Sequence, residues 1–108
     1  MVPSILYNVT VKIEKSISED WLSWMKQVHI PDVMKTNCFT SYRLTRIIEE
    51  PDEHGIGFAI QYLAPSIHDF QNYQKNFAAG LQKEHSERYH NKYVAFRTLL
   101  EIIEEKQY

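Results

Sequence analysis

The chain has 108 residues, of which 44% are hydrophobic, 13% aromatic and 24% charged. This length fits one compact domain, residues 1–108, and this composition excludes disordered, collagen-like and low-complexity proteins. Twelve basic and fourteen acidic residues give a formal charge of −2, so no basic surplus favours a nucleic acid backbone, and we expect no nucleic acid partner.

The sequence also bounds the cellular setting. A single cysteine, Cys38, cannot build a framework of internal disulfides. The first residues lack the basic and apolar regions of a signal peptide, and no apolar run approaches the ~18 residues that a membrane span needs. We therefore expect a cytoplasmic protein with no membrane partner.

The first predicted element is a strand over residues 5–14. Its odd positions are apolar or aromatic, and four of its five even positions are polar. This period of two is typical of a strand with one buried face.

A helix is predicted to follow from Ser18, whose side chain can accept hydrogen bonds at a helix start. An apolar stripe continues at helical spacing. It consists of Trp21, Trp24, Met25 and Val28. Because Pro31 lacks an N–H group, we expect the helix to kink or take a short second turn near His29.

Two β-rich runs, 39–48 and 56–63, are separated by a polar segment with Pro51 and Gly55, which favours an antiparallel hairpin. A second helix is predicted from about Ile67 to Tyr89, with Ser66 as its cap. A last strand is predicted over residues 93–103.

The order strand, helix, strand, strand, helix, strand predicts a ferredoxin-like α+β fold. In this βαββαβ arrangement, two helices cover one face of a four-stranded antiparallel sheet. On the last strand Val94, Phe96, Leu100 and Ile102 alternate with Ala95, Arg97, Leu99 and Ile103, so too much apolar surface remains on the other face. Since large exposed apolar areas mark interaction sites, we expect a second copy to cover this face in a homodimer.

A cavity between two such sheets could hold a small anionic or carbonyl-bearing ligand. Its expected polar lining is Thr10, Tyr42, Arg43, Gln61 and Arg97. The two arginines carry this expectation, because a guanidinium within a strand needs an oxygen partner. The alternative is that a carboxylate of this chain or of its partner satisfies them.

Histidines are the candidates for chemistry. His29, near Pro31, could act as a general base, or could bond carbonyl groups that the proline leaves free. His85 could join His29 only if packing brings the two helices together, and Trp24 could form an apolar wall. No metal-ligand spacing is present, because the position four residues after His85 is Tyr89, so we expect no metal and no cofactor.

Several segments resemble the family called domain of unknown function 4286. They are YNVTV (7–11), WM (24–25), HIPDVM (29–34), CFTSYRL (38–44), QY (61–62) and YVAFRTL (93–99). The resemblance implies a ferredoxin-like protomer similar to the dimeric α/β-barrel proteins, which include cofactor-free monooxygenases, isomerases and haem-handling enzymes. It assigns no activity to any residue.

Three functions remain open at this point. The first is a homodimer that binds a small ligand through Arg43 and Arg97. The second is a small enzyme of the monooxygenase or isomerase kind, in which His29 moves a proton and an arginine stabilises negative charge. The third is an interaction module without a ligand.

Overall fold

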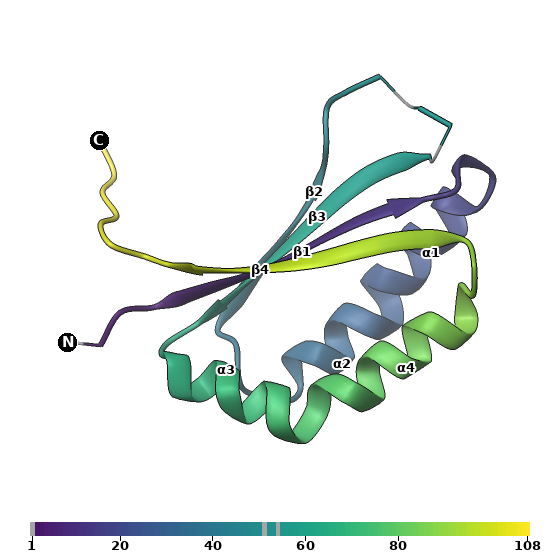
Figure 1. Ribbon diagram of the computed structural model, residues 1–108. Helices are drawn as coiled ribbons and strands as arrows, with labels where there is room; N and C mark the ends of the chain where they lie inside the picture. The colour runs from purple at the N-terminus through teal and green to yellow at the C-terminus, as the bar shows by residue number, and fades with distance from the viewer. Residues whose placement is uncertain (1, 51, 54) are drawn as a thin grey trace.

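The computed structural model describes residues 2–50, 52–53 and 55–108. Four strands form one antiparallel sheet in the order β2-β3-β1-β4. They are β1 (Ile5–Ile13), β2 (Ser41–Arg46), β3 (Ile56–Ala64) and β4 (Tyr93–Glu101). Two helical segments lie on one face of the sheet (Figure 1), so the predicted ferredoxin-like fold is confirmed. Pro51, which was expected in the hairpin turn, lies outside the described residues.

The first helical segment runs without a break from residue 18 to residue 34. A 3-10 turn, η1 (Lys15–Ile17), leads into it. The segment itself consists of α1 (Ser18–Trp24), the π-helical turn η2 (Met25–His29) and α2 (Ile30–Met34). The N–H of Ile30 donates to the carbonyl of Met25, five residues earlier. A proline ring in a regular α-helix meets the carbonyl four residues before it, and the wider turn just before Pro31 relieves that contact.

Two expectations for this segment are wrong. Ser18 does not accept a hydrogen bond at the helix start; it is buried, and its Oγ donates to the carbonyl of Lys15 at 2.9 Å. Val28 is 40% exposed, whereas Ile30 is 1% exposed. The π turn explains the second difference, because it places Ile30 five residues after Met25 on the core side and turns Val28 outward.

The second helical segment repeats this construction. It consists of α3 (Ile67–Tyr73), the π-helical turn η3 (Gln74–Ala78) and α4 (Ala79–Arg88). Ser66 caps it as predicted, because the N–H of Asp69 donates to Ser66 Oγ at 3.3 Å. The π turn again shifts the buried positions, so that Ala78 packs in the core and Phe77 is 38% exposed.

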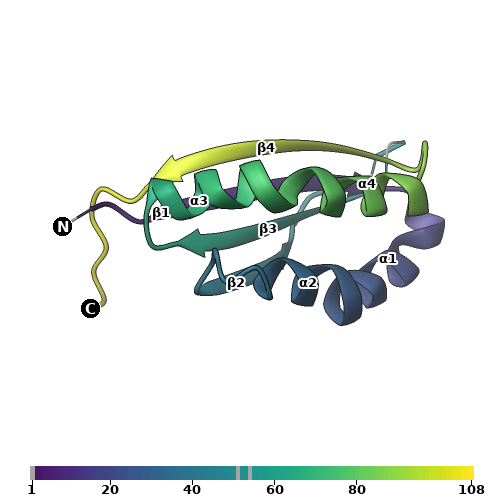
Figure 2. The same ribbon diagram turned by 90° about the horizontal axis from the view of Figure 1, so that it is seen from below.

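The core fills the space between the helices and the sheet. Figure 2 shows the two helical segments side by side, α3 and α4 toward β4, α1 and α2 toward β2. Trp21 from α1 contacts Phe58 of β3 with ring centroids 4.9 Å apart, and Tyr7 of β1 contacts Phe70 of α3 at 5.0 Å. Among the described residues, no helix is long and apolar enough to cross a membrane.

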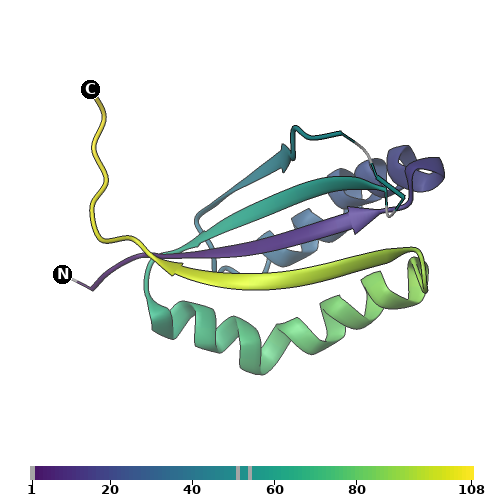
Figure 3. The same cartoon turned by 45° about the horizontal axis from the view of Figure 1, so that its top comes forward.

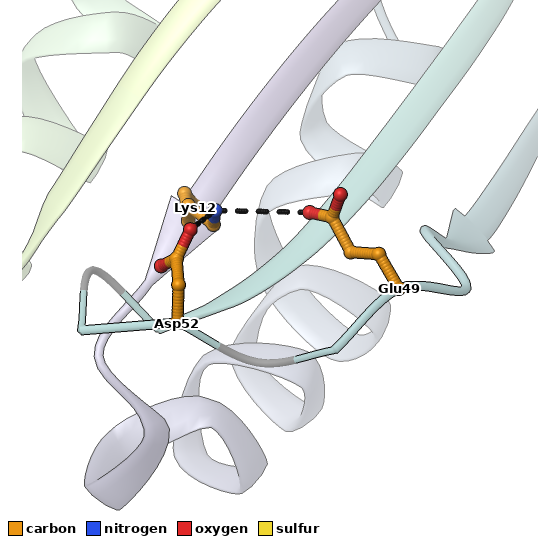
Figure 4. A network of polar contacts seen from close by, with 3 residues as sticks. All are labelled: Lys12, Glu49 and Asp52. Atoms are coloured by element: carbon orange, nitrogen blue, oxygen red, sulfur yellow. Dashed lines mark hydrogen bonds and ion pairs between the residues drawn. The ribbon is translucent and has the colours of Figure 1, made fainter.

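Within the part of the chain that the structure describes, no helix covers the other face of the twisted sheet (Figure 3). We call it the open face. At one end of it, the ammonium group of Lys12 on β1 pairs with Asp52 and with Glu49 Oε1, the latter at 3.7 Å (Figure 4). These ion pairs tie the connection between β2 and β3 to the open face.

Candidate functional site

A small hollow lies between the centre of the sheet and both helical segments, and we call it the central cavity. Its volume is about 30 Å³. Its walls come from β1, β3, β4, η2, α3 and α4. Six of its polar or titratable side chains are Tyr7, His29, Tyr73, Gln82, His85 and Arg97.

Packing brings His29 and His85 together, as their role in one site requires. Their ring centroids are 5.7 Å apart. The indole Nε1–H of Trp21 donates to Nε2 of His85 at 2.9 Å, so that this nitrogen is the unprotonated one. His29 Nδ1 is buried and has no hydrogen-bond partner among the residues that the structure describes.

Both histidines are neutral at pH 7. Burial is the main cause and lowers the pKa of His29 to about 4; the nearby carboxylate of Asp32 opposes this shift, and the charge of Arg97 adds to it. Burial also lowers the pKa of His85 to about 4, with smaller contributions from His29 and Arg97. A neutral imidazole offers one donor and one acceptor nitrogen.

Arg97 supplies the positive charge of the central cavity. It is exposed, and across the described part of the chain no carboxylate forms an ion pair with it. Burial raises the pKa of the Tyr7 hydroxyl, while the charge and hydrogen-bonding groups of Arg97, with the Gln82 amide, act in the opposite direction. Burial likewise raises the pKa of Tyr73, so both phenols stay protonated and can donate.

The strand register corrects the expected position of Arg97. Arg97 lies opposite Val9, and Val9 in turn lies opposite Ile60, whose side chain is in the core. Paired residues share a face of the sheet, so Arg97 points toward the helices and not into a space between two sheets. Tyr42 lies opposite the buried Tyr62 and so shares the helical face in the register, but it also lines the open-face hollow that Arg43 and Gln61 line.

The remaining sheet candidates do lie on the open face. Arg43 and Gln61 are direct partners in the register and line a hollow of about 220 Å³. Thr10 lines a separate hollow of about 230 Å³ together with Lys12. The expected ligand site is thus divided, with Arg97 on one face of the sheet and Thr10, Arg43 and Gln61 on the other.

Trp24 packs behind the histidines. Its ring lies 5.2 Å from that of His29 and 5.9 Å from that of His85. The guanidinium of Arg88 covers it at 5.4 Å from the ring centroid. Trp24 therefore holds the two imidazoles in place from outside the lining of the central cavity, which differs from the expected ligand wall.

Sequence reasoning missed three residues of the lining, namely Tyr7, Tyr73 and Gln82. Two signals were available. Tyr7 shares the parity of Val9 and therefore its face, and Gln82 precedes His85 by three residues, which places both on one side of a helix. Tyr73 gave no separate signal, because an aromatic residue at helical spacing is usually part of the core.

Both π turns border this region. Met25 and His29, the first and last residues of η2, line the central cavity. Gln74 and Ala78, the ends of η3, line a neighbouring groove. Single π turns within α-helices occur frequently at functional sites, so the two helices mark the same place independently of the polar residues.

The described residues contain no group of three or more His, Cys, Asp or Glu side chains that could hold a metal ion. Cys38 is buried at 2% exposure. Its Sγ accepts a hydrogen bond from Asn72 Nδ2 at 3.5 Å. Cys38 is thus a small residue of the core.

A family model named domain of unknown function (DUF4286) matches residues 4–103. The chain belongs to this family. No curated protein matches the sequence. The family assignment confirms the resemblance seen in the sequence, and the DUF4286 name describes no reaction.

Solved structures share the fold at low sequence identity. A dimeric ferredoxin-like protein from an uncultured marine organism has a TM-score of 0.66 and 10% identity, covering 96% of this chain and 99% of its own. A candidate monooxygenase from Shewanella loihica has a TM-score of 0.64 and 12% identity, covering 97% of this chain and 99% of its own. The hydroxynitrile lyase of Passiflora edulis has a TM-score of 0.58 and 14% identity over 95% and 97%. At these identities the DUF4286 chain shares their fold alone.

Proposed function

We propose that this protein is a homodimer in which each protomer binds a small anionic or carbonyl-bearing molecule in the central cavity. One observation carries the proposal: Arg97, without a carboxylate partner among the described residues, lines the same cavity as the buried, unpartnered Nδ1 of His29. Buried polar groups are nearly always hydrogen-bonded, so a ligand that bonds His29 Nδ1 would satisfy this atom, and the exposed guanidinium of Arg97 is available to bind the same ligand.

The donors suit an oxygen-bearing ligand. Arg97 offers a planar fork of N–H groups that matches a carboxylate. Tyr7 and Gln82 can add an O–H and an N–H donor, while neutral His29 can accept or donate according to its tautomer. No aspartate or glutamate lines the central cavity in the described structure, although the carboxylate of Asp32 lies near enough to His29 to affect its pKa.

The size of the cavity limits the part of the ligand that it holds. A volume of about 30 Å³ compares with the ~10–15 Å³ that a single water requires. Two waters, or the head group of a small acid, fit this space. Because the cavity lies within one protomer, the expected stoichiometry is one ligand per chain instead of one ligand shared between two sheets.

The open face supports the homodimer. Val94 and Phe96 of β4 are 62% and 63% exposed, and Leu100 is 42% exposed. Two of the proteins that share this fold are described as dimeric. A second copy placed sheet to sheet would remove these apolar side chains from water.

An enzyme of the same architecture is the second candidate. The free Nδ1 of His29 is a possible proton acceptor beside a cationic group that could stabilise negative charge. However, a group whose pKa is about 4 is a weak base at pH 7. Binding without turnover therefore ranks first, and catalysis would need a bound anion that raises this pKa.

Formate is a suitable probe, because its three heavy atoms match the cavity. Titration of the isotopically labelled protein with formate should shift the imidazole ring signals of His29 in the NMR spectrum. Arg97→Gln should weaken this binding more than tenfold, since hydrogen bonds to charged groups contribute about 1.5–3 kcal/mol.

Arg43→Gln is the matched control, because Arg43 is also an exposed strand arginine but lies on the open face. It should leave formate binding within about twofold of the parent. If Arg43→Gln abolishes binding and Arg97→Gln does not, the ligand lies between the sheets and the proposed site is wrong. If formate shifts no histidine signal in the parent, the interaction module without a ligand becomes the better description.

A further inference from the structure

A surface groove adjoins the central cavity along β4, and we call it the β4 groove. Its volume is about 220 Å³. Four residues line both spaces: Tyr7, Tyr73, Gln82 and Arg97. These side chains therefore form a common wall of the central cavity and the β4 groove.

The β4 groove has walls of its own beyond the four shared residues. Phe70, Ala78 and Leu99 contribute apolar surface to it, and Gln74 and Thr98 contribute polar groups. Leu99 is 47% exposed, and a bound apolar group would cover it. Arg97 is the single formally charged side chain among the described residues that line either space.

We infer that the ligand is a short monocarboxylic acid whose carboxylate binds Arg97 and whose apolar tail lies in the β4 groove. This inference rests on the proposed function, because it assigns a tail to the same bound head group. The groove is smaller than the ~300–1,000 Å³ of pockets for drug-sized molecules, which limits the tail to a short aliphatic chain or one ring.

Charge decides between this ligand and a neutral one. The guanidinium of Arg97, which has no carboxylate partner in the described structure, favours an anionic head, and none of the described residues in either lining is an aspartate or glutamate. A phosphorylated ligand would bring two negative charges to one arginine and two neutral histidines. A single carboxylate matches the single charge of Arg97.

The test compares acids of increasing length. Formate, acetate, butyrate and hexanoate are titrated into the protein, and dissociation constants are read from the ring signals of His29. Each buried methylene should tighten binding roughly fourfold, so hexanoate should bind at least tenfold more tightly than acetate. Hexanamide, which keeps the tail without the charge, should bind at least tenfold more weakly than hexanoate.

Leu99→Asn and Leu100→Asn form a matched pair. The two leucines are adjacent and similarly exposed, at 47% and 42%, but they point to opposite faces of β4. Leu99→Asn should remove most of the increase in affinity with the length of the acid and leave the affinity for formate unchanged. Leu100→Asn should keep the increase in affinity with length.

Three results would overturn the inference. Formate binding with no gain for hexanoate would refute the tail in the β4 groove and leave the proposed function standing. An equal loss in both leucine variants would place the tail in the hollow near the N-terminus, which Leu99 and Leu100 line together. Failure of every acid to bind the parent would refute this inference and the proposed function alike.

Discussion

His29 and His85 reach the central cavity from different helical segments, and their burial decides what they can do. In the unfolded chain an imidazole has a pKa of about 6.5, and in the folded protein burial lowers the pKa of each to about 4. Between these values the unfolded chain binds more protons than the folded protein. Stability therefore rises with pH across this window, is fully present above about pH 6.5, and is lost as the pH falls toward 4.

The first expected outcome is a pH dependence of unfolding. The free energy of unfolding in urea should be lower at pH 5 than at pH 7, because each pKa unit of lowering corresponds to about 1.4 kcal/mol. His29→Gln should reduce this difference, since its amide does not titrate. His90→Gln, at an exposed histidine, serves as the control and should preserve the parent dependence. Equal stability of the parent at the two pH values would contradict the burial argument.

Arg97 illustrates which features of a binding site can be predicted from a sequence. Strand parity alone groups Arg97 with Ala95 and Leu99 and separates it from Phe96. Both groups contain apolar residues, so parity does not tell which face the helices cover. The strand register identifies the face that the helices cover, because Arg97 lies opposite Val9, which packs against the core. The residue type was thus predictable as a ligand group, and its position needed the pairing of distant strands.

The helices show the same limit at the scale of elements. Each was predictable from apolar spacing and from its start or interruption signals, and the strands from their β-branched and alternating patterns. The two π turns were not, because apolar spacing assumes a constant turn. Pro31 gives a local cause for η2, and its effect was predictable as a kink. Residues 74–80 contain no proline, so η3 has no comparable local cause in the sequence.

Gly80 in α4 provides a prediction about element stability. A Cβ at this position would meet no heavy atom within 4 Å other than the helix's own nearby backbone. Gly80→Ala should therefore stabilise the protein by about 0.5–1 kcal/mol, because alanine loses less backbone entropy on folding. The urea midpoint should rise without a change in slope.

Gly55 is the contrasting position. Its φ is +118°, and a Cβ there would lie 2.0 Å from the carbonyl oxygen of Ile13. Gly55→Ala should destabilise the protein by at least about 1–3 kcal/mol.

For the Gly80 prediction, the contradicting outcome is a lower stability of Gly80→Ala than of the parent, which would show that α4 needs flexibility at that residue.

For the whole molecule, the proposed homodimer predicts which surface residues control association. Phe96→Glu places a charge in the middle of the open face, twice in a symmetric dimer. Burying these charges should raise the dissociation constant of the dimer at least about 100-fold, as measured by sedimentation equilibrium. Phe77→Glu is the control, because Phe77 is an exposed phenylalanine on the helical layer. It should leave the dimer intact.

A monomeric parent protein at micromolar concentration would contradict the proposed dimer. A Phe96→Glu protein that stays dimeric would show that another surface forms the interface. Neither result would affect the central cavity, which lies on the helical side of the sheet.

The two π turns also give the helices a fixed phase. Each residue of an α-helix rotates the chain by about 100°, and each π turn accommodates one residue more than a regular turn. Removing one residue from residues 26–28 or 75–77 would therefore let the helix close as a regular one and keep the residues after it on their present faces. A deletion after the π turn of the second segment, among residues 79–81, would not be absorbed in this way, and Gln82 and His85 would face a different direction. The length of each helical segment, counted in single residues, is therefore part of what aligns the cavity.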